Sequence, residues 1–407
     1  MRVTTNLIFN QNLRAINSSQ GNLSDIQTQL ASGKKLLRPS DDPVGASQVI
    51  RLTEEIDKIS QYQRNNDLVT NALELQETTL RSINDVVNRA RVLTVQSGNG
   101  ILSAPDKIAL GAEIEQLRNQ LVDLMNSQNA SGEYIFSGYQ SGQQAFEFNP
   151  SASNNRISFV GDDGTNIIQL SDSVSIQSTS SGKSLFEDVQ ARLNFSLPNV
   201  SGAVVENYQI KNQGSFDQFH RENFDPVNDA NNAFRFTIVS ANEIQVSNIG
   251  TGQILDSLVF ESGQDISFNG IQLNAVGVPG DTFDIELNRP KKANMAETLH
   301  TLFLALNDPN LSEQEYTSII DDTLVGLDNG LTRMARENSS LGARLNIAQS
   351  VESAQLDAEI ANQQARSAIE DVDYAEASSE FAKQETALEA AFASFPRIAN
   401  LSLFNYI

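Results

Sequence analysis

An apolar seam that repeats every three or four residues along both ends of the chain constrains its fold more than any other sequence feature. Residues 1 to about 130 and about 293 to 400 carry this seam, whereas residues from about 140 to 290 show a period of two. The first spacing places apolar side chains on one face of a helix, and the second is typical of strands. The sequence therefore predicts an α + β, multidomain chain that folds back on itself. The two helical arms would form a long antiparallel coiled-coil rod, with a mainly β insert between them in the sequence.

The N-terminal arm is predicted to contain two helices with a loop between them. The seam of the first helix runs through Phe9, Leu13, Ile16, Gln20, Leu23, Gln27 and Leu30, and Gly33 ends it. The second begins after Asp42, which can accept hydrogen bonds from free helix amides, with Pro43 fitting the first turn. Its seam is Leu52, Ile56, Ile59, Val69, Leu73, Gln76, Leu80, Ile83, Val87, Ala90 and Thr94. A helix from Val44 to Ser97 would be about 80 Å long, which predicts a rod.

Two capping boxes predict further helix starts, Ser103 with Asp106 and Ser312 with Glu315. The helix expected after Ser103 has a seam of Leu110, Ile114, Leu117, Leu121 and Leu124. On the C-terminal side the seam is rich in alanine, which would let a partner helix approach closely, although helix propensity alone could also explain it. This seam is Ile347, Val351, Ala354, Ala358, Ala361, Ala365, Ala368 and Val372.

The insert is predicted to contain a hairpin in which residues 156–160 and 166–170 flank a turn at Asp163-Gly164. Four more strands are expected, at residues 234–239, 243–247, 266–273 and 282–287. From Glu133 to Arg289 there are 19 acidic and 7 basic residues, which is more than half of the net charge of -23. This charge suits a solvated, outward-facing domain.

The last segment of the chain carries an aromatic stripe at the same helical spacing. It consists of Tyr374, Ala377, Phe381, Gln384, Leu388, Ala391, Phe395 and Ile398. Burying the apolar side chains of residues 388–407 would contribute about 10 to 20 kcal/mol. Fixing the backbone of those twenty residues would cost roughly 20 to 40 kcal/mol. Both termini are therefore predicted to be mobile in a monomer and to become helical when several copies pack together.

Composition excludes several classes of function. The 28 Lys and Arg against 51 Asp and Glu would repel nucleic acid and an anionic membrane. The absence of cysteine excludes disulfides, thiol chemistry and cysteine-based zinc sites. Residues 1–6 do not resemble a cleaved secretory signal, and no apolar run reaches the length of a membrane span.

The motifs that could indicate catalysis are weak. Residues 181–184 (SGKS) lack the glycine that a phosphate-binding loop needs, which favours a solvated turn. His220 has no second histidine at the spacing of a zinc protease. Asp162-Asp163 is interpreted as part of the hairpin turn, and Asp321-Asp322 and Glu370-Asp371 as solvated helix faces. We therefore expect no enzymatic activity, no metal and no cofactor.

Four motifs, in this order, resemble those of flagellin-type proteins. They are residues 29–35 (QLASGKK) with the loop Arg38, Pro39, Ser40, Asp41, Asp42 and Pro43, then 132–138 (GEYIFSG), 341–346 (LGARLN) and 401–407 (LSLFNYI). The loop is similar to the version found in hook–filament junction proteins, known as hook-associated protein 3, whereas flagellin itself reads closer to SAKDDAAG. The matching parts cover about 140 residues at the front and 110 at the back.

The resemblance implies a structural subunit that polymerises into a ring between hook and filament. Its partners would be further copies of itself, the hook-side junction protein, flagellin and a cytosolic export chaperone on the C-terminal helical region. Export would proceed unfolded, through the flagellar type III channel and without a cleaved signal, to the extracellular flagellum. The expected interface is Phe9, Leu13, Ile16, Leu23, Ile26, Leu30, Tyr374, Phe381, Leu388, Ala391, Phe395, Ile398, Leu403 and Phe404.

The resemblance also suggests a division of the chain into five parts. Residues 1–40 and 371–407 would form the inner axial core, 41–139 and 291–370 the helical rod, and 140–290 the outward-facing β insert. Two other functions stay open at this point. One is a flagellin that forms the filament itself, and the other is an adhesive surface protein that acts through the acidic insert.

Overall fold

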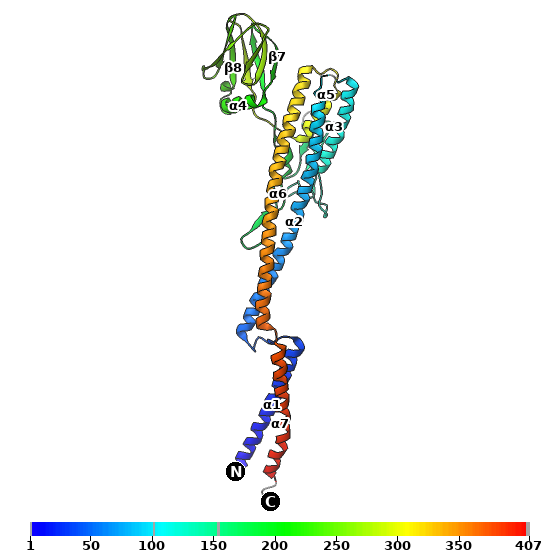
Figure 1. The fold of residues 1–407 in the computed structure, drawn as a ribbon, viewed down its shortest axis with the longest axis vertical. Helices are drawn as coiled ribbons and strands as arrows, with labels where there is room; N and C mark the ends of the chain where they lie inside the picture. The colour runs from blue at the N-terminus through cyan, green and yellow to red at the C-terminus, as the bar shows by residue number, and fades with distance from the viewer. Residues whose placement is uncertain (1, 101, 153–154, 404–407) are drawn as a thin grey trace. The chain divides into compact units, whose positions relative to one another are not determined.

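A computed structural model describes residues 2–100, 102–152 and 155–403 (Figure 1). The chain forms two compact units. Unit 1 comprises Met1–Thr70, Ile168–Ile176 and Leu345–Ile407, and unit 2 comprises Asn71–Ile167 and Gln177–Arg344. The predicted fold class is confirmed, because long helices occupy both ends of the chain and antiparallel strands its centre.

Unit 1 is built mainly from helices of the two ends of the sequence. They are α1 (Arg2–Ser32), the first part of α2 (Pro43–Ser97), the last part of α6 (Glu313–Glu370) and α7 (Tyr374–Leu403), with the short strands β3 (Ile167–Gln169) and β4 (Ser175–Gln177). Helix α1 packs along α7 (Figure 1). Gly33 ends α1 as predicted, with a φ of 71° that favours glycine.

The predicted seam of α2 is confirmed, since Ile59, Val69, Leu73, Leu80 and Ile83 are all buried. The alanine-rich seam predicted for α6 does not pack within the chain. Most of that seam is exposed, including Ile347, Ala354, Ala358, Ala361, Ala365 and Ala368. The buried face of α6 instead carries Leu341, Ala348 and Gln355. Hydrogen bonds reach two of these positions, since Asn66 of α2 donates to the backbone carbonyl of Ala348 and the Gln355 side chain donates to the carbonyl of Leu170.

The helical part of unit 2 adds α3 (Ala104–Met125) and α5 (Met295–Asn307), which pack on each other. The predicted capping box of α3 is present, with the Ser103 side chain accepting from the Asp106 amide and the Asp106 side chain accepting from the Ser103 amide. Ser312 and Glu315 form the same reciprocal pair before α6, with Oγ to amide N 3.2 Å and carboxylate to amide N 3.3 Å. Beside these helices lie β1 (Phe146–Phe148), β2 (Ile157–Phe159), η1 (Lys183–Glu187), β5 (Val189–Gln190) and β14 (Lys292–Ala293).

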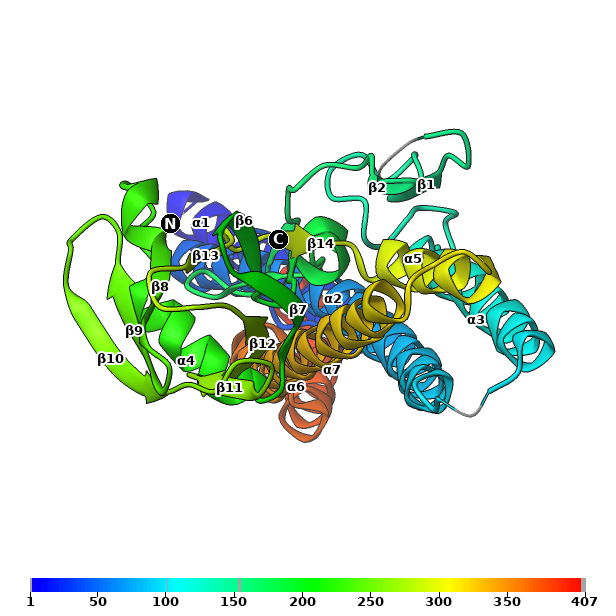
Figure 2. The ribbon, with the colours of Figure 1, turned by 90° about the horizontal axis from the view of Figure 1, so that it is seen from above.

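The rest of unit 2 is a β domain of two sheets and a helix (Figure 2). A five-stranded sheet has the order β10 (Ile254–Val259), β9 (Glu243–Asn248), β8 (Ala233–Ser240), β13 (Thr282–Leu287) and β6 (Phe195–Ser201). A three-stranded sheet has the order β11 (Asp265–Phe268), β12 (Ile271–Val276) and β7 (Val204–Ile210). Both sheets, α4 (Gln213–Asn223) and η2 (Asp229–Asn232) lie in this part of the chain, and one apolar core joins the sheets and α4.

Two strand predictions are wrong. The predicted hairpin is absent because β2 pairs with β1, where Phe159 lies opposite Phe146, while β3 pairs with β4. The aromatic contact, with ring centroids 5.3 Å apart, explains why Phe159 turns toward Phe146. The strand predicted at 266–273 is two strands, because Asn269 and Gly270 have φ values of 46° and 87° and form a hairpin turn.

Two segments that were predicted to be solvated, residues 181–184 and Asp321-Asp322, make specific contacts instead. Ser181 is buried, and its hydroxyl donates to Asp163 at 2.7 Å. This hydrogen bond and Lys183 lower the pKa of Asp163. Arg192 pairs with both Asp321 and Asp322, at 3.4 and 3.1 Å. Burial raises the pKa of Asp322 although the arginine opposes this effect.

Candidate assembly interface

The structure brings together the apolar stripes of α1 and α7 that the sequence singled out. Ile16 and Ala377 are buried between the helices, at 8% exposure each. Among the predicted interface residues, those half-buried are Leu23, Ile26, Leu30, Phe381, Leu388 and Ala391. A single copy thus covers these stripes only in part, which leaves apolar surface for contacts with other chains.

Other predicted interface residues are exposed or lie beyond what the structure describes. Leu13 is 37% exposed and Tyr374 is 58% exposed. Phe404 lies outside the described residues. For four further positions the structure describes the helical backbone but not the side chain. These are Phe9, Phe395, Ile398 and Leu403.

The helix breaks next to α1 and α7 are fastened to each other. Lys34 and Asp371 form an antiparallel β-bridge. Within it the amide of Lys35 donates to the carbonyl of Glu370 at 2.7 Å, and the amide of Val372 donates to the carbonyl of Gly33 at 3.0 Å. The ammonium of Lys34 also pairs with the carboxylate of Glu370. Glu370-Asp371 is therefore a point of attachment, whereas the sequence suggested a solvated helix face.

Replacing Gly33 by alanine is expected to destabilise this junction by about 1–2 kcal/mol, because alanine is strained at positive φ. The added Cβ would also lie 3.0 Å from the Tyr374 hydroxyl oxygen. Amide exchange measured in the purified chain should become faster in α1 and unchanged in α3. The matched control is Gly21→Ala, the same change within α1 at a position where the added Cβ meets nothing within 4 Å. Equal exchange rates in both variants would refute the predicted strain.

The motif loop from Arg38 to Pro43 starts α2. The carboxylate of Asp41 accepts from the amide of Arg38 at 2.9 Å. The carboxylate of Asp42 accepts from the amides of Val44 and Gly45 at 3.1 and 2.9 Å, which satisfies two of the free amides of the first turn. The loop therefore fixes where the rod helix begins.

A hairpin that the sequence did not reveal lies against both long helices of unit 1. The side-chain amide of Asn65 on α2 donates to the carbonyl of Gln169 at 2.8 Å, and that of Gln355 on α6 donates to the carbonyl of Leu170. At the tip of the hairpin the carboxylate of Asp172 accepts hydrogen bonds from the ammonium of Lys58 at 2.5 Å and from the hydroxyl of Tyr62 at 2.8 Å. These two hydrogen bonds lower the pKa of Asp172. The sequence predicted the strand at 166–170 but not its partner strand β4.

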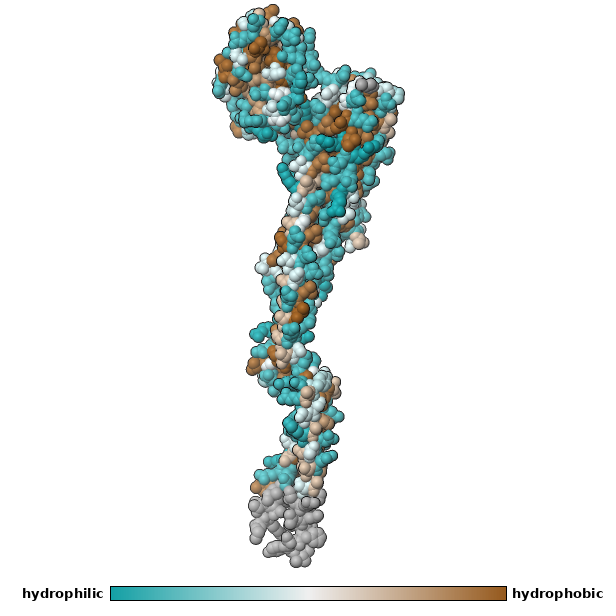
Figure 3. Space-filling view, viewed as in Figure 1, coloured by the Kyte–Doolittle hydropathy of each residue, from teal (hydrophilic) through white to brown (hydrophobic). Residues whose placement is uncertain are grey.

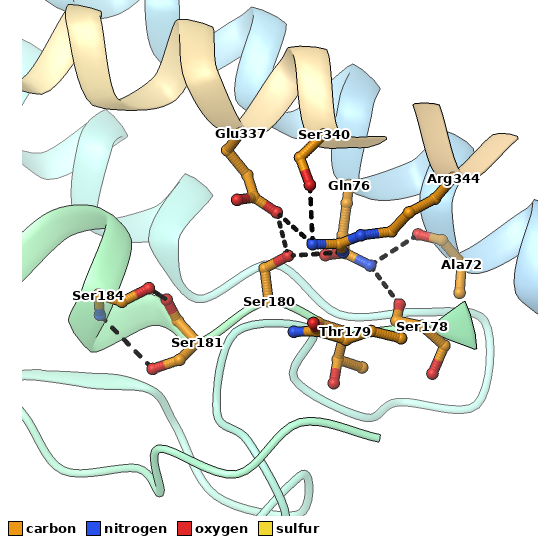
Figure 4. Close-up of polar contacts among 11 residues, drawn as sticks. Ala72, Gln76, Ser178, Thr179, Ser180, Ser181, Ser184, Glu337, Ser340 and Arg344 are labelled. Atoms are coloured by element: carbon orange, nitrogen blue, oxygen red, sulfur yellow. Dashed lines mark hydrogen bonds and ion pairs between the residues drawn. The ribbon is translucent and has the colours of Figure 1, made fainter. Parts of the chain in front are cut away.

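Arg344, in the 341–346 motif, organises a second polar cluster within unit 2 (Figure 4). Its guanidinium donates to Ser340 at 3.0 Å and lies 3.4 Å from Glu337. Glu337 in turn accepts from the Ser180 hydroxyl at 2.5 Å. On the other side Gln76 of α2 donates to the carbonyl of Ser178 at 2.6 Å. The segment 178–180 is thus held by both α2 and α6.

Arg118 and His300 form a buried pair between α3 and α5 that sequence reasoning missed. Nη1 of Arg118 lies 2.6 Å from Nδ1 of His300, and the guanidinium stacks on Phe148 at 4.7 Å. The arginine is a donor, so His300 accepts through an unprotonated Nδ1. Burial lowers the pKa of His300, and the charge of Arg118 lowers it further.

This pair predicts a loss of stability in mild acid. Glu297 and Glu115 oppose the lowering of the His300 pKa and Arg156 adds to it, but the net shift stays downward. The folded state therefore binds the proton more weakly than the unfolded state, so stability is complete above about pH 6.5 and falls as the pH decreases toward the folded pKa, by at most about 1.4 kcal/mol per unit. Denaturant unfolding at pH 5.0 and 7.5 tests this. His300→Gln, which keeps an acceptor, should flatten the difference, and an unchanged difference would contradict it.

The described residues contain no group of three or more His, Asp or Glu side chains that could hold a metal ion. Nor is any described helix both long and apolar enough to cross a membrane. The long helices have apolar faces that the rest of the chain covers only in part. Apolar side chains that remain exposed on α2 and α6 include Ile50, Leu68, Ile347, Leu356 and Ile360. Figure 3 shows such apolar residues on the surface of the long helices.

Comparison with known proteins agrees with this picture. Residues 3–141 match the family model of the bacterial flagellin N-terminal helical region, and residues 324–407 match that of the C-terminal helical region. The flagellar hook-associated protein 3 of Escherichia coli (strain K12) is 25% identical over 408 residues, which covers 99% of each chain.

Solved structures give the same result. The flagellar hook-associated protein 3 of Legionella pneumophila is 26% identical with a TM-score of 0.57, and the match covers 78% of this chain and 98% of that one. The flagellar junction protein FlgL from Legionella pneumophila is also 26% identical, with a TM-score of 0.55 and coverage of 79% and 100%. The sequence match to the Escherichia coli protein, which covers 99% of each chain, includes the insert as well as the helical ends.

Proposed function

Since this chain belongs to the bacterial flagellin family, we propose that it is a structural subunit of the junction between the flagellar hook and filament. The observation that supports this role best is the match along 99% of both chains to a hook-associated protein 3. The partly covered stripes of α1 and α7 supply the physical basis, because copies that pack side by side would bury what one copy leaves exposed.

The proposal includes the partners of such a subunit. Further copies of the chain would pack through the α1 and α7 stripes, with the hook-side junction protein on one side of the ring and flagellin on the other. A cytosolic chaperone would hold the C-terminal helical region before export without a cleaved signal. The division into axial core (1–40, 371–407), rod (41–139, 291–370) and insert (140–290) belongs to the same proposal.

We also propose that the chain has no catalytic activity. The relatives are named as a flagellar hook-associated protein and a flagellar junction protein, and neither name refers to an enzymatic activity. The titratable groups with shifted pKa values in the described residues have structural partners, as Asp322 has in Arg192 and His300 has in Arg118. The pKa shifts therefore have explanations that do not require a substrate.

Deletion of the gene tests the proposed role. The expected mutant assembles hooks but carries no filaments, and it sheds flagellin into the medium. Electron microscopy of the cells and an immunoblot of the culture supernatant measure both effects, with the wild-type gene on a plasmid as the control. Filaments of normal number and length in the mutant would exclude a junction role. If the mutant had no filaments and shed no flagellin into the medium, the result would favour the alternative that this chain is itself the filament subunit.

A further inference from the structure

Four helix ends in unit 2 surround an open groove of about 770 Å³. The end of α2, the start of α3, the end of α5 and the start of α6 all contribute to its wall. Two aliphatic side chains of this wall, Val95 and Ile108, are each 55% exposed. Tyr316 is buried at its base, where its hydroxyl donates to the carbonyl of Ser97 at 2.9 Å. Tyr316 is thus held to the end of α2 by a hydrogen bond, and the two aliphatic side chains of the wall are exposed.

The charges around this groove are predominantly negative. Asp308, Glu313 and Asp321 line it, and among its described lining residues Lys107 is the one base. The ammonium of Lys107 lies over the Tyr316 ring, 3.9 Å from its centroid, where it is already in a cation–π contact. Asp321 is compensated by Arg192. Asp308 and Glu313 remain as exposed carboxylates beside apolar surface.

We propose that this groove receives a loop of a neighbouring flagellin-family subunit, in which two aliphatic side chains are flanked by Lys or Arg. The aliphatic groups would cover Val95 and Ile108, and the cations would face Asp308 and Glu313. This chain itself contains a segment with that chemistry, residues 34–38 (KKLLR), directly after α1. Lys35 and Arg38 are exposed there and both leucines are half-buried, while Lys34 pairs with Glu370 of its own chain. The inference rests on the proposed function, because only an assembly of such subunits would present this loop to another copy's groove.

Other occupants fit the groove less well. An anionic lipid surface would be repelled by Asp308 and Glu313. An uncharged apolar segment would cover the wall but leave both carboxylates without a counter-charge. The sign of the rim therefore selects for a basic partner, and the exposed valine and isoleucine select for aliphatic contacts.

A peptide of residues 33–39 (GKKLLRP), labelled with fluorescein and titrated with the full chain, tests the proposal by fluorescence anisotropy. Binding is expected, with Kd increased at least about tenfold by the double change Asp308→Lys and Glu313→Lys. The control, Glu222→Lys with Glu261→Lys, makes the same change of net charge in the β domain and should leave Kd unchanged. A second peptide (GKKSSRP) tests the aliphatic contact and should bind more weakly.

Absence of binding, or equal affinities for the groove variant and the β-domain variant, would overturn the proposal. Equal affinities of the two peptides would also overturn the proposal, because they would show that the leucines contribute nothing to binding and that the interaction is purely electrostatic. In cells that lack the native gene, the groove variant should reach the hook tip by immunogold labelling yet support fewer filaments. Normal filaments with this variant would refute the groove contact alone, whereas normal filaments in the deletion strain would refute the junction role.

Discussion

Cells that carry Ile16→Asp as their one copy of the protein should have hooks without filaments. Ile16 is among the most buried described side chains of α1 and lies in its contact with α7. The change removes about 1.5–3 kcal/mol of apolar burial and places a carboxylate between α1 and α7, the two helices whose remaining apolar stripes are proposed to pack against other copies. Because every subunit would carry the same defect, the effect on the assembly should exceed that on one chain.

The control for this experiment is Asn17→Asp, which introduces the same carboxylate one residue further along the helix at an exposed position. It should leave motility in soft agar and filament number in electron micrographs unchanged. An immunoblot of the secreted chain distinguishes failed assembly from failed export. Filaments of normal number with Ile16→Asp would contradict the proposal that the α1 and α7 stripes form the interface.

The second large effect is expected from Phe236→Ala in the β domain. Phe236 is fully buried, stacks on Phe283 with centroids 4.8 Å apart and meets Phe268 edge to face at 5.5 Å. Removal of a buried phenyl ring costs about 3–5 kcal/mol. Denaturant unfolding of the purified chain should show this loss, while Thr237→Ala, on the next residue of β8, should change stability by less than about 1 kcal/mol.

The same variant separates the insert from assembly. Helices α1 and α7 do not contribute to the core around Phe236, so filaments should still form at a temperature at which the variant is folded. Loss of filaments under those conditions would mean that the insert takes part in the junction. A change in unfolding free energy below about 1 kcal/mol would instead contradict the packing described for the two sheets.

Local patterns in the sequence were sufficient to predict where several helices begin and where one buried strand lies. The start of α2 after Asp42, the capping boxes of α3 and α6 and the strand at 282–287 agree with the structure. In each case the signal lies within a few neighbouring residues. The hairpin predicted around Asp163 was wrong. Turn residues are present there, but β2 pairs with β1, where Phe159 contacts Phe146.

The partners of polar side chains could not be predicted in this way. Asn66 donates to the carbonyl of Ala348 across 282 positions of sequence, and Arg118 meets His300 across 182. Neither pair produces a periodic pattern in the sequence. Many exposed asparagines, glutamines and arginines can also form hydrogen bonds, so the residue type alone does not identify the partner. The alanine-rich face of α6 shows the same limit, since helical periodicity indicates that a face is apolar but not which chain covers it.

By itself the sequence determined that helices at both ends enclose strands, where several of those helices begin, and the two apolar stripes of the terminal helices. These features depend on backbone preferences and on periods of two to four residues, which short stretches of chain specify. Only the tertiary structure decided which faces meet, which carboxylates acquire arginine partners and where the acidic groove lies. Such pairings depend on burial and geometry between residues far apart in the chain, which become defined only when the whole chain has folded.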